Sequence, residues 1–217
     1  ADSWIRFICY EGTENEWANI AIQKGNEELD PEHAGVEHWF RLYECNLSGD
    51  MVYQASDDAA TLVRYFGSDS KVDIPAELGG KPVTEIGEWA FAYYSSLTEV
   101  TIPEGVTTID YAAFYHCDNL DNVILPDTVN TVGAKAFTHT GWMDDFEENS
   151  MDDFLISGDI LVAYKGNLPE VVIPDGVRVI AEEAFRNHTE LKKVHLPASV
   201  TDIGNDAFPE GIEIINE

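Results

Sequence analysis

The sequence predicts a solenoid of short stacked repeats with a small β-rich cap at its N-terminal end. The dipeptide Ala-Phe returns along the chain at steps of 23, 23, 48 and 23 residues. Dipeptides of an aliphatic residue and proline keep the same 23-residue period, as in Ile102-Pro103 and Leu125-Pro126. A fixed period of roughly 20–50 residues is the sequence signature of repeat architectures. The five Ala-Phe units are Ala90-Phe91, Ala113-Phe114, Ala136-Phe137, Ala184-Phe185 and Ala207-Phe208.

Residues 1–50 do not carry the repeat, and they predict the small β-rich cap or subdomain. β-branched and aromatic residues at 4–10 indicate one strand, and residues 17–23 indicate a second. Residues 36–45 fit either a strand or a helix. Ser-Gly-Asp at 48–50 indicates a turn that precedes the repeats.

Residues 51–217 are predicted to form the repeat array, which starts twice. The pattern Leu-Val-x-Tyr-x-Gly-x4-Val-x-Ile-Pro occurs at 62–75 and, with the same spacing, at 161–174. Between them a repeat is remodelled rather than deleted, because the 48-residue step equals two periods of 23 plus two residues. This remodelled part, about residues 139–166, contains an acidic stretch. It also contains a predicted β-hairpin over 154–162 with glycine in its turn.

One repeat, residues 97–120, shows how the pattern is expected to fold. Leu97, Val100 and Ile102 are separated by polar residues, which suits a short parallel strand with one buried side. Pro103 ends that strand because proline cannot donate to a continuing ladder. Stacking neighbours about 4.8 Å apart would bury residues that one repeat cannot bury alone. The remaining inward positions are predicted at Val106 and Ile109 on a second short strand or turn, at Ala112, Ala113 and Phe114 on a helical turn, and at Cys117 and Leu120.

The composition excludes several classes of partner. With 44% hydrophobic residues, the chain of 217 residues can build a core. Its 12 basic and 41 acidic residues give a net charge of −29. Such a chain repels nucleic acid and anionic lipid, because it has no basic patch to displace phosphate counterions. It also has no apolar run of about 18 residues, so we expect no membrane insertion.

No catalytic or metal-binding motif is recognisable in the sequence. The zinc-protease spacing H-E-x-x-H is missing around His33 and His38, and so are the nucleophile elbow, the P-loop and the dinucleotide fingerprint. Cys117 occupies a recurring repeat position and is predicted to be a small core residue rather than a nucleophile. The three cysteines allow one disulfide at most, with Cys9 and Cys45 as the pair outside the repeats. We therefore predict a protein without enzymatic activity and without a cofactor or a metal, and its oligomeric state stays open.

The repeat itself resembles a known family. The pattern Leu-x-x-Val-x-Ile-Pro-x-x-Val-x-x-Ile-x-x-x-Ala-Phe is similar to the BspA-like leucine-rich repeat of bacterial surface and secreted proteins, over about residues 62–215. The resemblance implies a leucine-rich-repeat solenoid with a parallel concave β-sheet and short convex strands or helical turns. It also implies an extracellular or cell-surface location and a role in adhesion or recognition, with a protein partner such as a host extracellular protein. The glycine that the family usually carries is present at Gly87, Gly133 and Gly204, and is replaced at Asp110 and Ala181.

If the concave sheet binds a partner, the exposed residues on either side of each central inward residue are the candidates. They form two columns of mixed chemistry, without the uniform acidic or aromatic strip that would indicate a metal or a glycan. The alternative is an ordinary solvated sheet surface. The first column is Lys71, Glu99, Asn122, Glu170, Lys193 and Gly211, and the second is Asp73, Thr101, Ile124, Val172, His195 and Glu213.

The acidic stretch between the two starts is predicted to be a solvated charged loop. It holds six carboxylates in ten residues but lacks the alternating D-x-D-x-D-G arrangement of a calcium loop. These carboxylates belong to Asp144, Asp145, Glu147, Glu148, Asp152 and Asp153.

An alternative function assigns the binding site to the cap. In that case the solenoid would be a structural spacer or stalk that presents the N-terminal region. Trp4, Trp17 and Trp39 lie outside the repeats, and exposed aromatic residues often mark binding surfaces. The same tryptophans could instead seal the open end of the solenoid, as terminal caps do.

Overall fold

The structure, a computed structural model, describes residues 8–10, 42–44 and 46–216. Strand β1 (Ile8–Tyr10) pairs in parallel with β2 (Leu42–Glu44). Most of the predicted cap lies outside the described residues, including its three tryptophans and its two histidines. The second predicted cap strand therefore stays a prediction, and whether Cys9 and Cys45 form a disulfide stays open.

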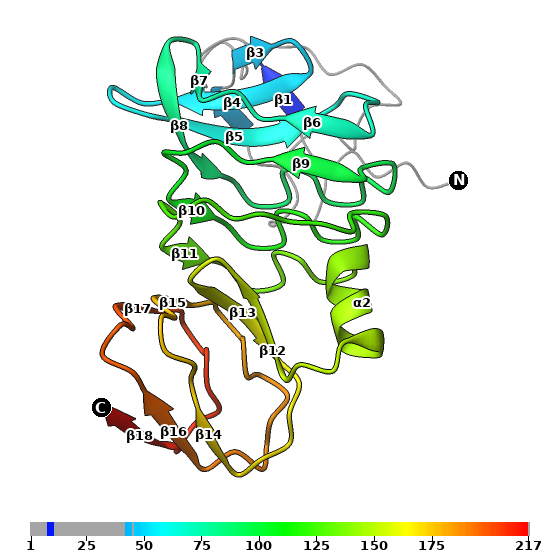
Figure 1. The fold of residues 1–217 in the computed structure, drawn as a ribbon. Helices are drawn as coiled ribbons and strands as arrows, with labels where there is room; N and C mark the ends of the chain where they lie inside the picture. Colours follow the sequence, from blue (N-terminus) through cyan, green and yellow to red (C-terminus); the bar gives the residue numbers. More distant parts are fainter. Residues whose placement is uncertain (1–7, 11–41, 45, 217) are drawn as a thin grey trace, which may run out of the picture.

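A pair of antiparallel strands leads into the repeats. Strand β3 (Asn46–Ser48) turns back into β4 (Met51–Ala55), which confirms the turn predicted at 48–50. Strand β4 pairs antiparallel with β5 (Ala60–Tyr65), and β5 pairs in parallel with β8 (Lys81–Ile86). Strand β7 (Glu77–Leu78) pairs antiparallel with β8. Strands β3 and β4 thus continue one wall of the solenoid and cover its end (Figure 1).

The first block of repeats confirms the predicted stack of parallel strands. On one wall β6 (Lys71–Asp73) pairs with β9 (Glu99–Thr101), and Glu99 bridges to Asn122. On a second wall β8, β10 (Thr108–Ile109) and β11 (Thr131–Val132) pair in parallel. Thr108 lies opposite both Glu85 and Thr131, so the register equals the 23-residue period.

The Ala-Phe segments form a third ladder between repeats. The amide of Phe91 donates to the carbonyl of Ala113, and that of Phe114 donates to Ala136, both at 2.8 Å. The helical turn predicted at 112–114 is wrong. The segment instead makes overlapping turns such as Ala113 N to Asp110 O, because every second amide is engaged with the neighbouring repeat.

This ladder requires left-handed backbone at non-glycine residues. The residue before each Ala-Phe pair has a φ between +51° and +59° in all five units. Such a conformation costs about 1–2 kcal/mol for an L-residue, and the hydrogen bonds between repeats offset that cost. The five residues are Trp89, Ala112, Lys135, Glu183 and Asp206.

The core is a column of stacked side chains that runs through the repeats. The ring of Phe114 lies 5.0 Å from that of Phe91 and 5.4 Å from that of Phe137, with interplanar angles of 8° and 5°. All three phenylalanines are at most 1% exposed. The same cluster continues through the second block to Phe185. The predicted inward residues are therefore confirmed as the core.

The remodelled repeat contains a helix and a hairpin. Helix α2 (Gly141–Asn149) begins after Thr140, whose side chain accepts a hydrogen bond from the amide of Met143. The prediction of a loop over the acidic stretch is wrong for its first half, because Phe146 gives the helix a buried side. The hairpin is confirmed as β12 (Phe154–Ser157) and β13 (Ile160–Tyr164).

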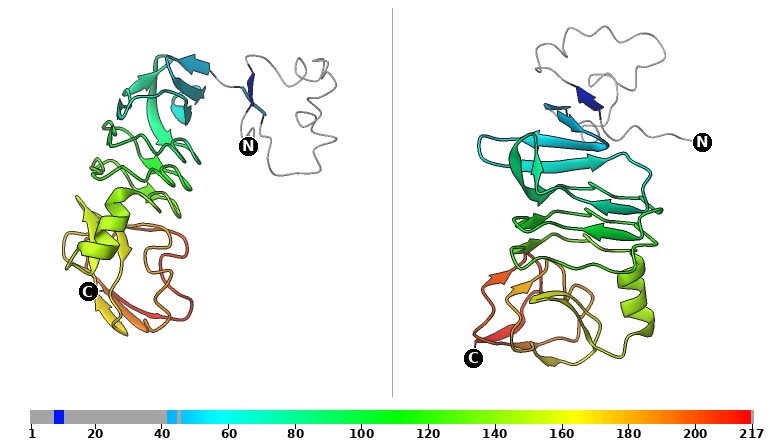
Figure 2. Two further views of the ribbon diagram at one scale, coloured as in Figure 1. Left: turned by 90° about the vertical axis from the view of Figure 1, so that its right-hand side faces the viewer. Right: turned by 45° about the horizontal axis from the view of Figure 1, so that its top comes forward.

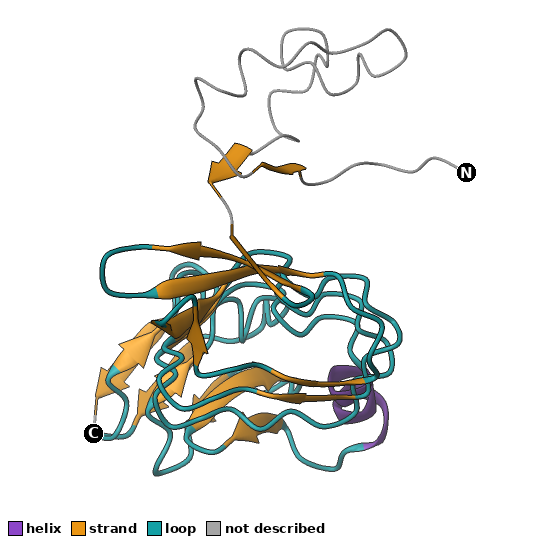
Figure 3. Cartoon of the chain, turned by 90° about the horizontal axis from the view of Figure 1, so that it is seen from above, coloured by secondary structure: helices purple, strands orange, loops and turns teal. Residues whose placement is uncertain are grey.

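The second block repeats the two-walled arrangement. Strands β13, β15 (Val179–Ile180) and β17 (Asp202–Ile203) form one wall. Strands β14 (Glu170–Val172), β16 (Lys193–Leu196) and β18 (Glu213–Asn216) form the other. The two blocks follow one another along the stack, with α2 beside their junction (Figure 2). Seen down the stack, the repeats surround a common interior and α2 occupies one corner (Figure 3).

Recurring glycines mark the places where repeats approach most closely. A Cβ on Gly133 would lie 2.7 Å from Tyr111 N, and one on Gly204 would lie 2.4 Å from Glu182 N. In the double-start pattern, a Cβ on Gly67 or Gly166 would lie 2.1–2.2 Å from the hydroxyl of the tyrosine two residues before it. The Tyr-x-Gly spacing therefore lets a tyrosine ring pack over its own strand end.

We expect Phe114→Ala to lower the free energy of unfolding by about 3–5 kcal/mol, because it empties the middle of the phenylalanine column. Chemical denaturation followed by circular dichroism measures the change. Phe66, which is 60% exposed, provides the matched control. Phe66→Ala should change the free energy by about 0.5 kcal/mol or less. A cost below about 1 kcal/mol for Phe114→Ala would contradict the stacked core.

We expect Gly133→Ala to lower the unfolding free energy by about 1–3 kcal/mol, because its methyl group meets the backbone of the preceding repeat. Thermal and chemical denaturation give the value. Asp110→Ala is the control at the equivalent position one repeat earlier, where a Cβ is already accommodated. It should cost only the hydrogen bond from Tyr111 N to Asp110 Oδ1, about 1 kcal/mol. Equal costs for the two substitutions would argue against a steric role for the glycine.

Candidate functional site: an aromatic surface on the Ala-Phe segments

Aromatic side chains gather on the outside of the Ala-Phe ladder in the first block. Alanine and phenylalanine point into the core there, and several residues that flank them point outward, whereas Ala92 and Ala112 are buried. In three successive repeats these flanking residues are mostly aromatic or histidine. We call this group the aromatic surface, and it consists of Trp89, Tyr93, Tyr111, Tyr115, His116 and His139.

Trp89 is the centre of the aromatic surface. Its ring meets Tyr111 and Tyr115 edge-on, with centroid distances of 5.4 and 5.6 Å. It also lies parallel to Tyr93, at 6.4 Å and an interplanar angle of 1°. Each edge-to-face pair adds about 0.5–1.5 kcal/mol beyond area burial, so the rings hold one another in place.

The aromatic surface extends across the repeats to a pair of histidines. Tyr93 stacks on His116 at 5.2 Å, and His116 stacks on His139 at 4.3 Å. Tyr115 contacts His139 edge-on at 5.7 Å. Tyr93 is 49% exposed, so the rings present polarisable faces to solvent rather than to the core.

Charged groups border these rings. The ammonium of Lys135 lies 5.5 Å from the ring centroid of Tyr111 and donates to its hydroxyl at 3.2 Å. His116 Nδ1 lies 3.1 Å from an oxygen of Asp118. The group therefore combines apolar faces with polar edges, which is the composition of binding hot spots.

The sequence analysis missed the aromatic surface, although a signal for it was present. The search for a functional face followed the columns of the predicted concave sheet. The three positions that flank the Ala-Phe pair hold Trp, Ala and Tyr in the first repeat, Ala, Tyr and His in the second, and Lys, Thr and His in the third. Which of them touch one another depends on the register between repeats.

The predicted strand columns lie on the outer sides of two separate sheets. The column residues on β6 and β9 are exposed, and so are Asn122 and Ile124. In the sheet of the second block, Glu170 and Val172 on β14 are exposed. Ile124 and Val172 are the most exposed apolar members, at 71% and 61%. Lys193 and His195 in the second sheet are half-buried. The role of the columns in binding stays a prediction.

The charges within these columns pair with one another. Lys71 Nζ lies 2.5 Å from Glu99 Oε2, and His195 Nε2 lies 2.8 Å from Glu170 Oε1. The Glu99 carboxylate raises the pKa of the Lys71 ammonium, and the hydrogen bond from His195 holds the pKa of Glu170 below its ordinary value. These pairs are solvent-exposed and contribute little stability.

Two assignments within the columns are wrong, those of Gly211 and Glu213. Glu213 was expected beside His195, but the register places it opposite Lys193, with Lys193 Nζ 3.5 Å from Glu213 Oε2. His195 faces Ile215 instead. The last repeat is shorter than the others, since Lys193 to Glu213 spans 20 residues rather than 23.

Groups that could support catalysis or metal binding do not converge in the part of the chain that the structure describes. Among residues 8–10, 42–44 and 46–216, no group of three or more His, Cys, Asp or Glu side chains could hold a metal ion. Within the same residues, no helix has the length and apolarity needed to cross a membrane. Cys117 is fully buried, and its thiol donates to the carbonyl of Phe91 at 3.2 Å. Burial raises the pKa of this thiol to about 12.

The fold and the repeat register can now be compared with known proteins. The model of the BspA type leucine-rich repeat region matches in six copies, over residues 70–150 and 159–216. The chain belongs to the BspA-type leucine-rich repeat family. Proteins of this family are typically non-enzymatic repeat modules. Among curated proteins, none matches this sequence.

Solved structures of bacterial leucine-rich repeat proteins are similar to this member of the family. A leucine-rich cell surface protein from Faecalibacterium prausnitzii is 27% identical, with a TM-score of 0.48, covering 79% of this chain and 50% of the other. A leucine-rich repeat protein from Bacteroides capillosus is 27% identical, with a TM-score of 0.44 and coverages of 71% and 99%. One from T. pallidum is 21% identical, with a TM-score of 0.42 and coverages of 78% and 85%. This chain spans about half the length of the Faecalibacterium protein.

We expect Cys117 to resist alkylation by iodoacetamide in the folded protein at about pH 8, because its buried thiol stays protonated far above that pH. Peptide mapping by mass spectrometry measures the labelled fraction at this position. The same treatment in guanidinium chloride should label Cys117 fully, since unfolding exposes it and returns its pKa to the ordinary range. Equal labelling of folded and unfolded protein would show that the thiol is accessible and reactive.

Proposed function

We propose that this leucine-rich repeat protein is a non-catalytic binding module that acts outside the cell or on its surface and recognises another protein. The observation that carries the proposal is the aromatic surface, where rings from three successive repeats are ordered against one another and remain partly exposed. Tryptophan and tyrosine dominate binding hot spots, because they bury a large area with few rotatable bonds. The family supports a location at the cell surface or in the secreted fraction.

The aromatic surface is better suited to binding than the strand columns. The charges on the columns already pair within the sheet, as Lys71 does with Glu99 and His195 with Glu170. A partner would have to desolvate and replace those pairs, which gains little free energy. The rings around Trp89 are already ordered by their mutual contacts, so a partner orders few further side chains.

The acidic composition adds a preference among partners. With a net charge of −29, the chain attracts basic proteins over long range and repels acidic ones. We therefore expect a basic extracellular protein as the partner. The charge would speed encounter, and the rings would provide the contact that resists dissociation.

The test measures binding of the full chain to a panel of host extracellular proteins by surface plasmon resonance. Trp89→Ala and Tyr93→Ala should each weaken binding about tenfold or more, because each removes an exposed ring from the contact. Phe66→Ala is the matched control, since Phe66 is also an exposed aromatic side chain but lies outside the aromatic surface. It should change the affinity by less than about twofold. Circular dichroism verifies that each variant is folded.

Substitutions in the strand columns give the result that would contradict this proposal. If Glu99→Lys and Glu170→Lys abolish binding while Tyr93→Ala has no effect, the partner uses the sheet and the proposed surface is wrong. If neither set of substitutions changes the affinity, the partner binds elsewhere on the chain, as the spacer alternative requires.

A further inference from the structure

The ladder between Ala-Phe segments is interrupted after the first block. In an intact pair of repeats, three amides of one repeat donate to three carbonyls of the next, at 3.0, 2.8 and 3.0 Å. These amides belong to Ala112, Phe114 and His116, and their acceptors are the carbonyls of Ala134, Ala136 and Thr138. The remodelled repeat supplies no Ala-Phe segment, so the next position in this ladder is vacant.

Unpaired backbone groups line both sides of that interruption. The amides of Lys135, Phe137 and His139 lie 23 residues after the three donors, and within residues 46–216 none of them has an acceptor. On the opposite side, the carbonyls of Glu182 and Arg186 are likewise without a donor in the described part of the chain. The equivalent carbonyls in the first block accept from the preceding repeat, as Tyr111 O accepts from Trp89 N.

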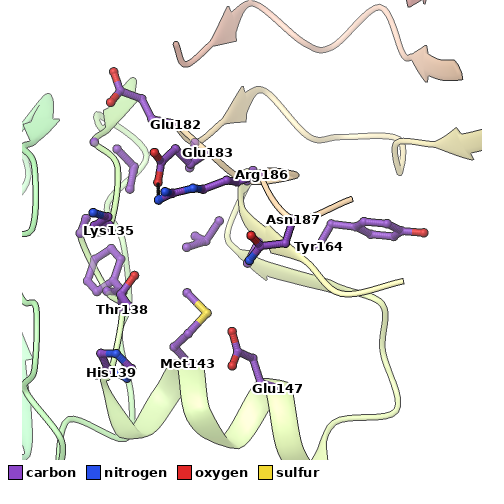
Figure 4. A pocket seen from close by; sticks show the side chains of 18 of the residues that line it. Lys135, Thr138, His139, Met143, Glu147, Tyr164, Glu182, Glu183, Arg186 and Asn187 are labelled. Atoms are coloured by element: carbon purple, nitrogen blue, oxygen red, sulfur yellow. Dashed lines mark hydrogen bonds and ion pairs between the residues drawn. The ribbon is translucent and has the colours of Figure 1, made fainter. Parts of the chain in front are cut away.

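A cavity of about 320 Å³ separates these two sides. One side carries Lys135, Thr138 and His139, and the other carries Arg186 and Asn187 (Figure 4). Helix α2 borders the cavity from below, with the side chains of Met143 and Glu147 directed toward it (Figure 4). The cavity is therefore bounded by a row of donors, a row of acceptors and an acidic helix.

The interruption is held open by contacts at its inner end. The amide of Glu182 donates to Val132 O at 2.9 Å, and its carboxylate accepts from Ala134 N at 3.0 Å. Tyr164 fills the core behind the cavity, where it contacts Phe154 and Phe185 at 5.0 and 4.8 Å. The two blocks are thus fixed at their spacing, and the unpaired backbone groups are confined to the outer side.

We propose that this cavity binds a basic segment of another polypeptide, which takes the place of the missing Ala-Phe segment. The main chain of the segment would accept hydrogen bonds from Lys135, Phe137 and His139 and donate to the carbonyls of Glu182 and Arg186. Recognition by main-chain pairing at an open ladder provides affinity with little demand on sequence. Backbone groups without a partner in the protein favour an occupant that pairs with them.

The acidic groups at the cavity select a basic segment. Asp144 and Glu147 line it from α2, and neither forms an ion pair within the described part of the chain. The lining holds two cations, Lys135 and Arg186, and Arg186 is engaged by Glu183 at 2.8 Å. Together with Glu182, the carboxylates of the lining outnumber these cations by four to two. Lysine or arginine side chains that alternate along the segment would reach these carboxylates. The cavity borders the aromatic surface and shares His139 with it, but this inference does not rest on the proposed function of that surface.

The probe is the acetylated and amidated peptide Ala-Lys-Ala-Lys-Ala-Lys-Ala, titrated into the full-length ¹⁵N-labelled chain. We expect the amide protons of Lys135, Phe137 and His139 to shift downfield and to exchange more slowly, because each gains an acceptor. A twin peptide with N-methylated alanines keeps every charge but loses main-chain donors. It should bind about tenfold more weakly or worse. Equal binding of the two peptides, or shifts elsewhere in the chain, would overturn the proposal.

Substitutions on α2 separate this site from general charge attraction. Glu147→Lys should weaken the peptide about tenfold, because it places a cation at the cavity. Glu148→Lys makes the same charge change one residue along the exposed side of the helix, outside the cavity lining, and should weaken it by less than about twofold. Equal losses from the two substitutions, or no binding of the parent peptide at millimolar concentration, would contradict a site at the cavity. Tyr93→Ala should leave peptide binding unchanged, whatever it does to the partner of the aromatic surface.

Discussion

Hydrogen bonding between adjacent repeats is the constraint on which this structure depends. One repeat has no helix, no closed sheet and no core of its own, so its backbone groups must be paired with the next repeat. This requirement explains the left-handed backbone before every Ala-Phe pair, which directs alternate amides toward the neighbour. It also explains Gly133 and Gly204, where a side chain would hold the two backbones apart. The stacked phenylalanines follow, because a fixed register places each ring on the one before it.

The same constraint determines what happens where a repeat is remodelled. The strand ladder is closed by Ser157, whose buried hydroxyl accepts from Leu125 N at 3.1 Å and donates to Val123 O at 3.3 Å. The inner part of the Ala-Phe ladder is closed by Glu182, which bonds to the first block through both its amide and its carboxylate. The outer part is not closed, and three amides and two carbonyls there have no partner within residues 46–216. At the junction between the two blocks, the side chains of Ser157 and Glu182 thus take the place of backbone hydrogen bonds. The outer part of the junction remains open as the cavity beside α2.

Because the inward residues are required by the fold, function is left to the outward ones. Outward residues on the strands are of mixed chemistry, and charged ones such as Lys71 and Glu99 pair among themselves. Outward residues on the Ala-Phe segments are aromatic and pack into a continuous group around Trp89. Both kinds of surface lie on the same stack of repeats. The outward residues of the strands can therefore change without changing those of the Ala-Phe segments. The acidic charge of the whole chain biases any partner toward a basic protein.

The amino-acid sequence by itself determined the period, the inward residues, the double start and the hairpin, because each depends on residue chemistry that recurs at fixed spacing. Only the tertiary structure decided which outward residues meet. Trp89 and Tyr115 are 26 residues apart, so their contact follows from the register between repeats rather than from any local pattern. The pairing of Glu213 with Lys193 in the shorter last repeat is likewise set by the register and not by a local pattern. Helix α2 also depends on packing. The same holds for the amides of Lys135, Phe137 and His139, because no feature of these residues in the sequence indicates that they lack an acceptor within residues 46–216.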